Sequence, residues 1–291
     1  MQKILVIGGT RYLGLEFLNL IKADDIEIFV ASRKEIITKN FIYIDRKNQS
    51  DLDELFLHNN FDVVIDFICY SGADSEKLFK SIILQKKTPK LILISTVYTY
   101  GSPLDIEVDS FFDEKSFNAN LHPESLLDRP LVSYNQGKRD MESYFEKKYN
   151  NEKLIILRFP IILGANDYTL RTHFYVNLIK NKIKINPNKI DNKTSYIFSI
   201  EAAQSILNFV KNDDFGTFNV AYESVSERSL IKLYCEYFCS NMDALIDLNM
   251  VAENTPFTSN FNFIIDSKKY NSIHPFRINF KEALFRELSK F

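Results

Sequence analysis

Hydrophobic residues along the first half of the chain occur in short uninterrupted runs that alternate with helically spaced positions. The run from 4 to 7 is apolar at every position, as in a strand buried on both faces of a parallel sheet. Strands alternating with helices predict an α/β fold with a doubly wound parallel sheet. The predicted strands are 4–7, 26–31, 41–44, 63–67, 91–94 and 154–158, and the predicted helices are 15–21, one through Leu52, Leu55 and Phe56, 74–84, and one that opens in the stretch 133–142 and runs to about 148.

Glycines interrupt the chain directly after the first predicted strand. Glycine permits a tight turn and the close approach of a phosphate to the backbone, and a helix start offers unpaired N–H groups to an anion. We therefore interpret the stretch 8–14 as a dinucleotide-binding loop of a Rossmann-type domain, with an ordinary tight turn as the alternative. Its candidate cofactor contacts are Gly8, Gly9, Thr10, Arg11, Tyr12, Leu13 and Gly14.

The end of the second predicted strand bears on the choice of cofactor. In NAD-binding folds an acidic residue near this point holds the ribose 2′-hydroxyl, whereas an arginine accommodates a 2′-phosphate. Here Arg33 and Lys34 follow the strand. The pattern favours NADP, with NAD as the alternative if the two cations are only solvated surface residues. Because parallel strands end at one edge of a sheet, the ligand crevice is expected to gather Gly8, Arg33, Asp45, Asp66 and Thr96.

Beyond residue 160 the alternation of strands and helices loosens. The pattern predicts helices at 168–179, 202–210 and 230–239, an extended segment at 195–200 and a strand at 217–220. We therefore expect a dinucleotide-binding domain over 1–160. A smaller mixed α/β part over 161–291 should bind the substrate, and from it the chain returns to the main sheet at least once.

Composition and charge narrow the classes of partner. The chain has 291 residues and a net charge of −2, which gives no electrostatic reason to expect nucleic acid or an anionic membrane. No apolar run approaches the roughly 18 residues that span a bilayer, and the N-terminal run is too short for a signal sequence. We expect a cytoplasmic protein. The three cysteines and four histidines show no metal-ligand spacing, so no metal site is predicted.

The helix predicted to open in the stretch 133–142 carries Tyr134 and Lys138. Residues four apart lie on one helical face with neighbouring side chains. A tyrosine titrates near 10 in water, and a neighbouring ammonium favours its ionised form. The pair is therefore a candidate acid/base, although this spacing also occurs often by chance.

Two other features suggest substrate contacts. The segment 102–130 is irregular and mostly acidic, so it is interpreted as a lid or substrate loop, with a solvated insertion as the alternative. Arg158, Arg171 and Arg228 are candidates for gripping a diphosphate, because guanidinium is planar and bidentate. A surface or packing role is the alternative for each arginine.

Taken together, these stretches resemble the extended short-chain dehydrogenase/reductase family, the NAD(P)-dependent sugar epimerases, dehydratases and ketoreductases. Family members usually carry glycine where this chain has Arg11, so the Gly-Gly-Thr-Arg form looks like an atypical subgroup, some of whose members have lost catalysis. The matching residues are the stretch 8–14, Ser95-Thr96 with Tyr100-Gly101, Tyr134-x-x-x-Lys138, Arg158-Phe159-Pro160, Phe218-Asn219-Val220 and Asp266-Ser267-Lys268-Lys269.

The resemblance implies a role for each member of the pair. Tyr134 would be the acid/base, Lys138 its electrostatic partner and a cofactor contact, and Thr96 the hydroxyl that orients the substrate.

The main hypothesis is hydride transfer on a nucleotide-linked sugar by ketoreduction, and the alternative is an epimerase that retains its cofactor. The family's dehydratases place an acidic pair after the Ser/Thr, whereas Val97-Tyr98 stand here, which argues against dehydration. The family also implies a homodimer.

A non-catalytic hypothesis has a different basis. The Gly-Gly-Thr-Arg form also resembles stem-loop RNA-binding relatives, which would use the fold only for binding. The slightly acidic chain and the absence of a basic patch with interleaved aromatics argue against RNA. A protein that only binds would also not need Tyr134, Lys138 and Thr96 together.

Overall fold

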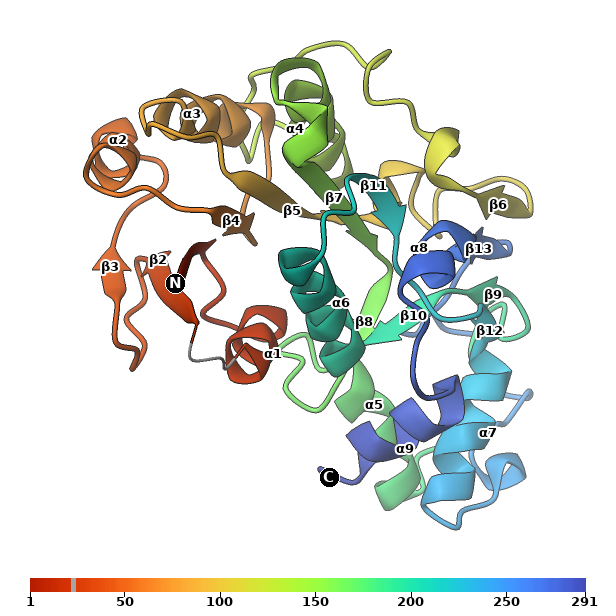
Figure 1. Ribbon diagram of the computed structural model, residues 1–291. Coiled ribbons are helices and arrows are strands. Elements are labelled where there is room, and N and C mark those ends of the chain that lie inside the picture. The colour runs from red at the N-terminus through yellow and green to blue at the C-terminus, as the bar shows by residue number, and fades with distance from the viewer. Residues whose placement is uncertain (22–24) are drawn as a thin grey trace. The chain divides into compact units, whose positions relative to one another are not determined.

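The computed structural model describes residues 1–21 and 25–291, and the chain divides into two compact units. Unit 1 contains Met1–Thr99, Glu114–Phe159 and Ala202–Phe218. Unit 2 contains Tyr100–Asp113, Pro160–Glu201 and Asn219–Phe291. Each unit is therefore assembled from three separate pieces of the chain (Figure 1).

Unit 1 is built on one sheet, whose strands are β1 (Gln2–Ile7), β2 (Ile26–Ser32), β3 (Phe41–Tyr43), β4 (Val63–Asp66), β5 (Lys90–Thr96), β7 (Leu154–Phe159) and β11 (Gly216–Asn219). Their order across the sheet is β11-β7-β5-β4-β1-β2-β3. Neighbouring strands from β3 to β7 run parallel, with Ile4 opposite both Ile28 and Val63. The chain order reverses on either side of β1, so β1 and β4 flank the point where ligands bind in open α/β sheets.

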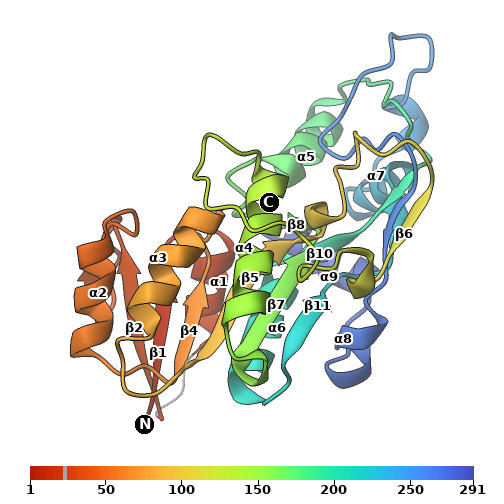
Figure 2. The same ribbon diagram turned by 90° about the horizontal axis from the view of Figure 1, so that it is seen from above.

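Helices cover both faces of this sheet. They are α1 (Leu13–Leu20), α2 (Gln49–His58), α3 (Gly72–Ile82), α4 (Tyr134–Lys148) and α6 (Ser199–Lys211), with the 3₁₀ turns η1 (Val97–Thr99), η2 (Glu114–Ser116) and η3 (Asn151–Lys153). Figure 1 shows α2, α3 and α4 over one face and α1 and α6 over the other. Figure 2 shows α2, α3 and α4 in front of the row of strands from β2 to β7. Apolar side chains with no exposure, such as Leu5, Phe56, Leu78 and Phe145, fill the layer beneath α2, α3 and α4.

This architecture confirms the predicted doubly wound α/β fold, including the late return of the chain to the main sheet through β11. The helix predicted to open in the stretch 133–142 is α4, which begins at Tyr134 because the Ser133 side chain accepts a hydrogen bond from the Gln136 N–H and caps the first turn. Some predicted bounds were wrong. The helix predicted at 168–179 begins only at Arg171. The extended segment 195–200 stops at Phe198, and Ser199 and Ile200 already belong to α6.

Unit 2 combines short strands with four α-helices. The strands are β6 (Ser110–Phe112), β8 (Ile161–Leu163), β9 (Lys193–Thr194), β10 (Tyr196–Phe198), β12 (Val225–Ser226) and β13 (Phe263–Ile265). The helices are α5 (Arg171–Asn181), α7 (Glu227–Tyr237), α8 (Lys268–Ile273) and α9 (Phe280–Leu288), with the 3₁₀ turn η4 (Met242–Ala244). β8 pairs with β10, and the other four strands form a sheet in the order β12-β9-β13-β6. Stacked rings, such as Tyr175 and Phe257 with centroids 5.0 Å apart, fill its core.

Asn219, in the Phe218-Asn219-Val220 stretch, ties separate parts of unit 2 together. Asn219 is fully buried, and its Oδ1 accepts a hydrogen bond from the Tyr100 hydroxyl at 2.7 Å. Its Nδ2 donates to the Asp266 carbonyl at 3.0 Å. A buried amide that satisfies two distant segments explains why this position requires asparagine.

Candidate functional site

The loop between β1 and α1 depends on its glycines. Gly8 and Gly9 have positive φ angles of 81° and 68°, which side chains with a Cβ rarely adopt. Gly14, in the first turn of α1, packs against the loop so closely that a Cβ there would lie 2.1 Å from the Gly9 Cα. The helix can therefore start directly over the turn, which is the geometry needed for the backbone N–H groups to face an anion.

Arg11 and Tyr12 occupy the middle of this loop. Arg11 is exposed, whereas Thr10 and Leu13 on either side of the pair are buried. Tyr12 is the N-cap of α1 with φ 41° and ψ −113°, a strained backbone for a residue with a side chain, and its side chain makes no capping hydrogen bond. Strain of this kind is often retained at binding sites. The strain at Tyr12 is therefore consistent with the cofactor loop predicted for 8–14.

A cavity of about 250 Å³ opens at the carboxyl ends of β2, β3 and β4 in unit 1. Of the five residues expected at the crevice, Arg33 and Asp45 line this cavity, with their charged atoms 3.8 Å apart, whereas Gly8, Asp66 and Thr96 are not among its lining residues. The Arg33 side chain is 70% exposed, so its guanidinium can reach a ligand. The other residues that line the cavity are Ala31, Ser32, Ile44, Arg46, Lys47, Ile68, Tyr70, Asp74 and Arg129.

A buried network of charges at this cavity was not predicted from the sequence. Arg46 donates from Nη1 to both carboxylate oxygens of Asp66 at 2.9 and 2.7 Å, and from Nη2 to the Asp74 carbonyl oxygen at 3.1 Å. Burial alone would lower the pKa of Arg46, but the charges of Asp66 and Asp74 raise that pKa above its ordinary value. Asp66 interrupts an apolar strand, and a buried carboxylate needs a buried cation, so Asp66 was the signal that could have revealed Arg46.

Lys138 is held at the carboxyl ends of the central strands. Its Nζ donates to the carbonyl of Ile94 in β5 at 2.5 Å and to the carbonyl of Cys69, after β4, at 2.9 Å. The side chain is 1% exposed, and this burial lowers the pKa of Lys138 to about 8. An ammonium has three donors, so one N–H is left for a further acceptor.

Tyr134 opens α4 one turn before Lys138 and is half-buried. The Lys138 Nζ lies 5.9 Å from the centroid of the Tyr134 ring and 4.7 Å from that of Tyr70. The two phenol rings are themselves 6.2 Å apart. The structure thus brings together the predicted pair and adds Tyr70, which the sequence analysis did not single out.

Gly137 positions this pair, and Thr96 ends the neighbouring strand β5. Gly137 lets α4 lie directly on the neighbouring loop, because a Cβ there would be 2.1 Å from the Tyr70 carbonyl oxygen. Thr96 ends β5, two residues after Ile94, and its Oγ1 accepts a hydrogen bond from the Tyr98 N–H at 3.2 Å. Thr96 is only 6% exposed.

The three arginines considered for diphosphate binding are committed elsewhere. Arg158 is 1% exposed, donates from Nε to both carboxylate oxygens of Glu142 at 3.1 and 3.0 Å, and bonds the Glu114 carbonyl. The structure therefore gives Arg158 the packing role, which corrects the prediction for this residue. In unit 2, Arg171 lies 3.7 Å from Asp167, and Arg228 forms a bidentate pair with Asp191 at 2.6 and 3.0 Å.

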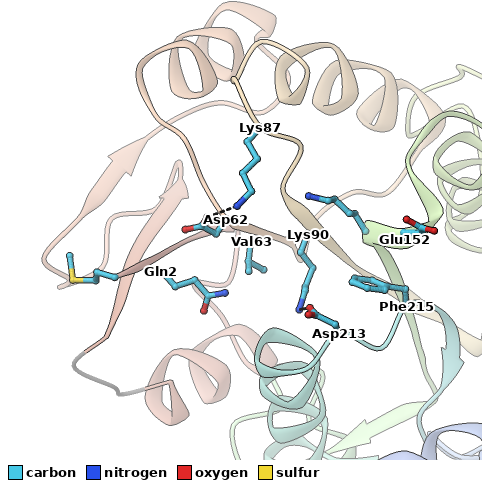
Figure 3. Close-up of a pocket in the computed structure, with 10 residues that line it drawn as sticks. Gln2, Asp62, Val63, Lys87, Lys90, Glu152, Asp213 and Phe215 are labelled. Atoms are coloured by element: carbon cyan, nitrogen blue, oxygen red, sulfur yellow. Dashed lines mark hydrogen bonds and ion pairs between the residues drawn. The ribbon is translucent and has the colours of Figure 1, made fainter.

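A larger cavity of about 550 Å³ lies at the opposite edge of the sheet, where β1, β4 and β5 begin (Figure 3). Its lysines already have partners. Lys87 faces Asp62 at 3.5 Å, and Lys90 pairs with Asp213 at 2.9 Å while it donates to the carbonyls of Phe209 in α6 and of Asn212 just after it. We therefore interpret this cavity as a surface hollow whose charges are already paired. We take the carboxyl edge of the sheet as the candidate functional site.

Comparisons with known proteins concern the family and the fold of the chain. The family model described as the NAD dependent epimerase/dehydratase family matches residues 4–221. No curated protein sequence matches the chain significantly. Within the described residues, no helix is both long and apolar enough to cross a bilayer.

Three solved structures illustrate the similarity of fold. A UDP-glucose 4-epimerase from Thermotoga maritima with UDP-glucose has a TM-score of 0.75 at 16% identity, covering 99% of this chain and 98% of that one. A dTDP-glucose 4,6-dehydratase from Bacillus anthracis in complex with NAD has a TM-score of 0.75 at 15% identity, covering 99% and 96%. A dTDP-4-dehydrorhamnose reductase from Clostridium acetobutylicum has a TM-score of 0.68 at 17% identity, covering 99% of each chain.

Proposed function

The chain belongs to the NAD-dependent epimerase/dehydratase family, and from this premise we propose that it reduces a keto group on a nucleotide-linked sugar by hydride transfer. The observation that carries the proposal is the position of Lys138, whose ammonium is fixed at the ends of β4 and β5 beside Tyr134. The substrate class is proposed from structures of similar fold that act on UDP- and dTDP-sugars.

The glycine loop fits the diphosphate of a nicotinamide dinucleotide. The positive φ angles of Gly8 and Gly9 and the close packing of Gly14 leave the start of α1 open to an anion. Residues 8–14 would hold the diphosphate, and Arg33, Asp45 and the remaining N–H of Lys138 are proposed to bind the riboses. When bound, the cofactor supplies the hydride chemistry.

Tyr134 is proposed to move the proton that accompanies this chemistry at its phenol oxygen. An ordinary tyrosine titrates near 10, so a nearby positive charge must favour the phenolate for the residue to work near neutral pH. Lys138 supplies such a charge, because a pKa of about 8 keeps it mostly protonated at pH 7. Thr96 is proposed to orient the substrate oxygen through its hydroxyl.

Tyr134→Phe tests this assignment. We expect turnover to fall about 100-fold or more, as for the loss of a general acid/base, while cofactor affinity and melting temperature stay nearly unchanged. The matched control is Tyr43→Phe, which changes a 68% exposed tyrosine in β3 and should leave turnover unaffected. Undiminished turnover in Tyr134→Phe would remove this residue from the mechanism.

NADP is the proposed cofactor, because Arg33 rather than a carboxylate follows β2, and its 70% exposed side chain can reach a 2′-phosphate. Replacing Arg33 with Gln should raise the KM for NADPH about tenfold or more and leave the KM for NADH unchanged. Equal effects on both dinucleotides would contradict a 2′-phosphate contact.

Cofactor exchange separates the reductase from the epimerase alternative. A reductase releases the oxidised dinucleotide after each turnover, whereas an epimerase holds its cofactor throughout. We expect purified protein to bind added NADPH reversibly and to consume it with 4-keto sugar nucleotides. Full occupancy after purification, with no NADPH consumed, would establish the epimerase reading instead.

A further inference from the structure

The segment before α4 is anchored to the start of α3. A Cβ on Gly72, the first residue of α3, would lie 1.7 Å from the Ser125 carbonyl oxygen, so the two backbones touch directly. Asp128 accepts hydrogen bonds at Oδ1 from Lys47 Nζ at 2.5 Å and from the hydroxyl of Ser71, the N-cap of α3, at 3.1 Å. Residues 125–129 are thereby fixed beside the cavity.

This anchoring places Arg129 on the phenol rings of the candidate site. Its guanidinium carbon is 5.8 Å from the centroid of the Tyr134 ring and 5.9 Å from that of Tyr70. The Arg129 backbone N–H donates to Asp128 Oδ1 at 2.8 Å, which joins the anchor to the arginine. Arg129 also lines the 250 Å³ cavity at the carboxyl ends of the strands.

Arg129 differs from Arg46 and Arg158 in whether a carboxylate neutralises its charge. Arg46 and Arg158 are each neutralised by a carboxylate. Within residues 1–21 and 25–291, the guanidinium of Arg129 contacts the two rings and forms no ion pair. A cation binds a neutral phenol ring weakly and a phenolate much more strongly, so an unneutralised arginine favours the ionised form.

We propose that Arg129 is a positioning residue for Tyr134, which holds the phenol ring in place and favours its phenolate as a second cation beside Lys138. The inference rests on the proposed role of Tyr134 as acid/base. The charged and titratable groups that face the ring include Lys138 on α4, Tyr70 after β4, and Arg129 itself.

The test is the pH at which the Tyr134 phenol ionises, followed by NMR of tyrosine labelled with ¹³C at Cζ. The Tyr134 signal is assigned by its loss in Tyr134→Phe. In Arg129→Gln and in Arg129→Met, which keeps an unbranched side chain of similar length, we expect the midpoint of ionisation to rise by about one pH unit. Arg129→Lys should restore most of the wild-type value, because it retains the charge.

Lys232→Gln is the control for net charge, since it removes an exposed cation from α7 in unit 2. An unchanged midpoint in folded Arg129→Gln or Arg129→Met, or an equal rise in Lys232→Gln, would overturn the proposal. The titration needs no substrate, so it is independent of the sugar reaction. If the shift occurs in a protein without reductase activity, the positioning role stands and only the proposed function fails.

Discussion

The contribution of the buried pair of Arg46 and Asp66 to the free energy of unfolding can be tested directly. Arg46→Met removes the two bonds to Asp66 and the one to the Asp74 carbonyl, and it leaves the fully buried Asp66 carboxylate without its cation. Breaking a buried ion pair from one side costs about 3–5 kcal/mol. With a urea slope of about 2–3 kcal/mol per M, the unfolding midpoint should fall by about 1–2 M. Far-UV circular dichroism suits the measurement, because the chain has no tryptophan.

Asp66→Asn supplies the partner for a double-mutant cycle. The Asp66 Oδ1 also accepts a bond from the Ile68 N–H at 2.8 Å, which the amide oxygen of asparagine can preserve. Removing the stranded charge should therefore make Arg46→Met/Asp66→Asn about 1–3 kcal/mol more stable than Arg46→Met alone. A loss below about 1 kcal/mol in Arg46→Met, or no recovery in the double variant, would refute the reasoning.

Two further predictions concern the glycine loop and Lys138. Gly14→Ala places a methyl group 2.1 Å from the Gly9 Cα, so we expect the dinucleotide Kd by calorimetry to rise about tenfold or more, and unaltered binding would contradict the close packing. Because Lys138 titrates near 8 in the folded chain and near 10.5 in the unfolded one, the unfolded state binds more protons between these pH values. The free energy of unfolding of the wild type should therefore rise with pH relative to Lys138→Met, by about 3 kcal/mol from pH 8 to 10.5, and parallel stability curves would rule this out.

The hydrophobic pattern predicted the main sheet because its strands are buried on both faces. Ile4, Val64 and Ile92 all have no exposed area, so each strand appears in the sequence as a continuous apolar run. The strands of unit 2 are only two or three residues long and pair with partners distant in sequence, as β6 does with β13. So short a run cannot be distinguished from a loop by periodicity.

The candidate site was partly predictable for a similar reason. Tyr134 and Lys138 lie on one helical turn, so their proximity follows from spacing alone. Arg129 and Tyr70 meet that pair only through the tertiary path of two loops. Arg158 shows the reverse error, because a planar guanidinium suits Glu142 as well as it suits a diphosphate, and only burial distinguishes the two.

The division of each unit into three pieces of chain determines which truncated fragments of the protein can fold. The chain passes between units at 99/100, 113/114, 159/160, 201/202 and 218/219. A fragment that stops at residue 160 would lack β11 and α6, which leaves the outer side of β7 unpaired and apolar surface open to water. Truncated forms should therefore aggregate, whereas co-expressed complementary fragments could reassemble. Both units must be completed by late-synthesised sequence, so the nascent chain cannot finish folding unit 1 before the ribosome has passed residue 218.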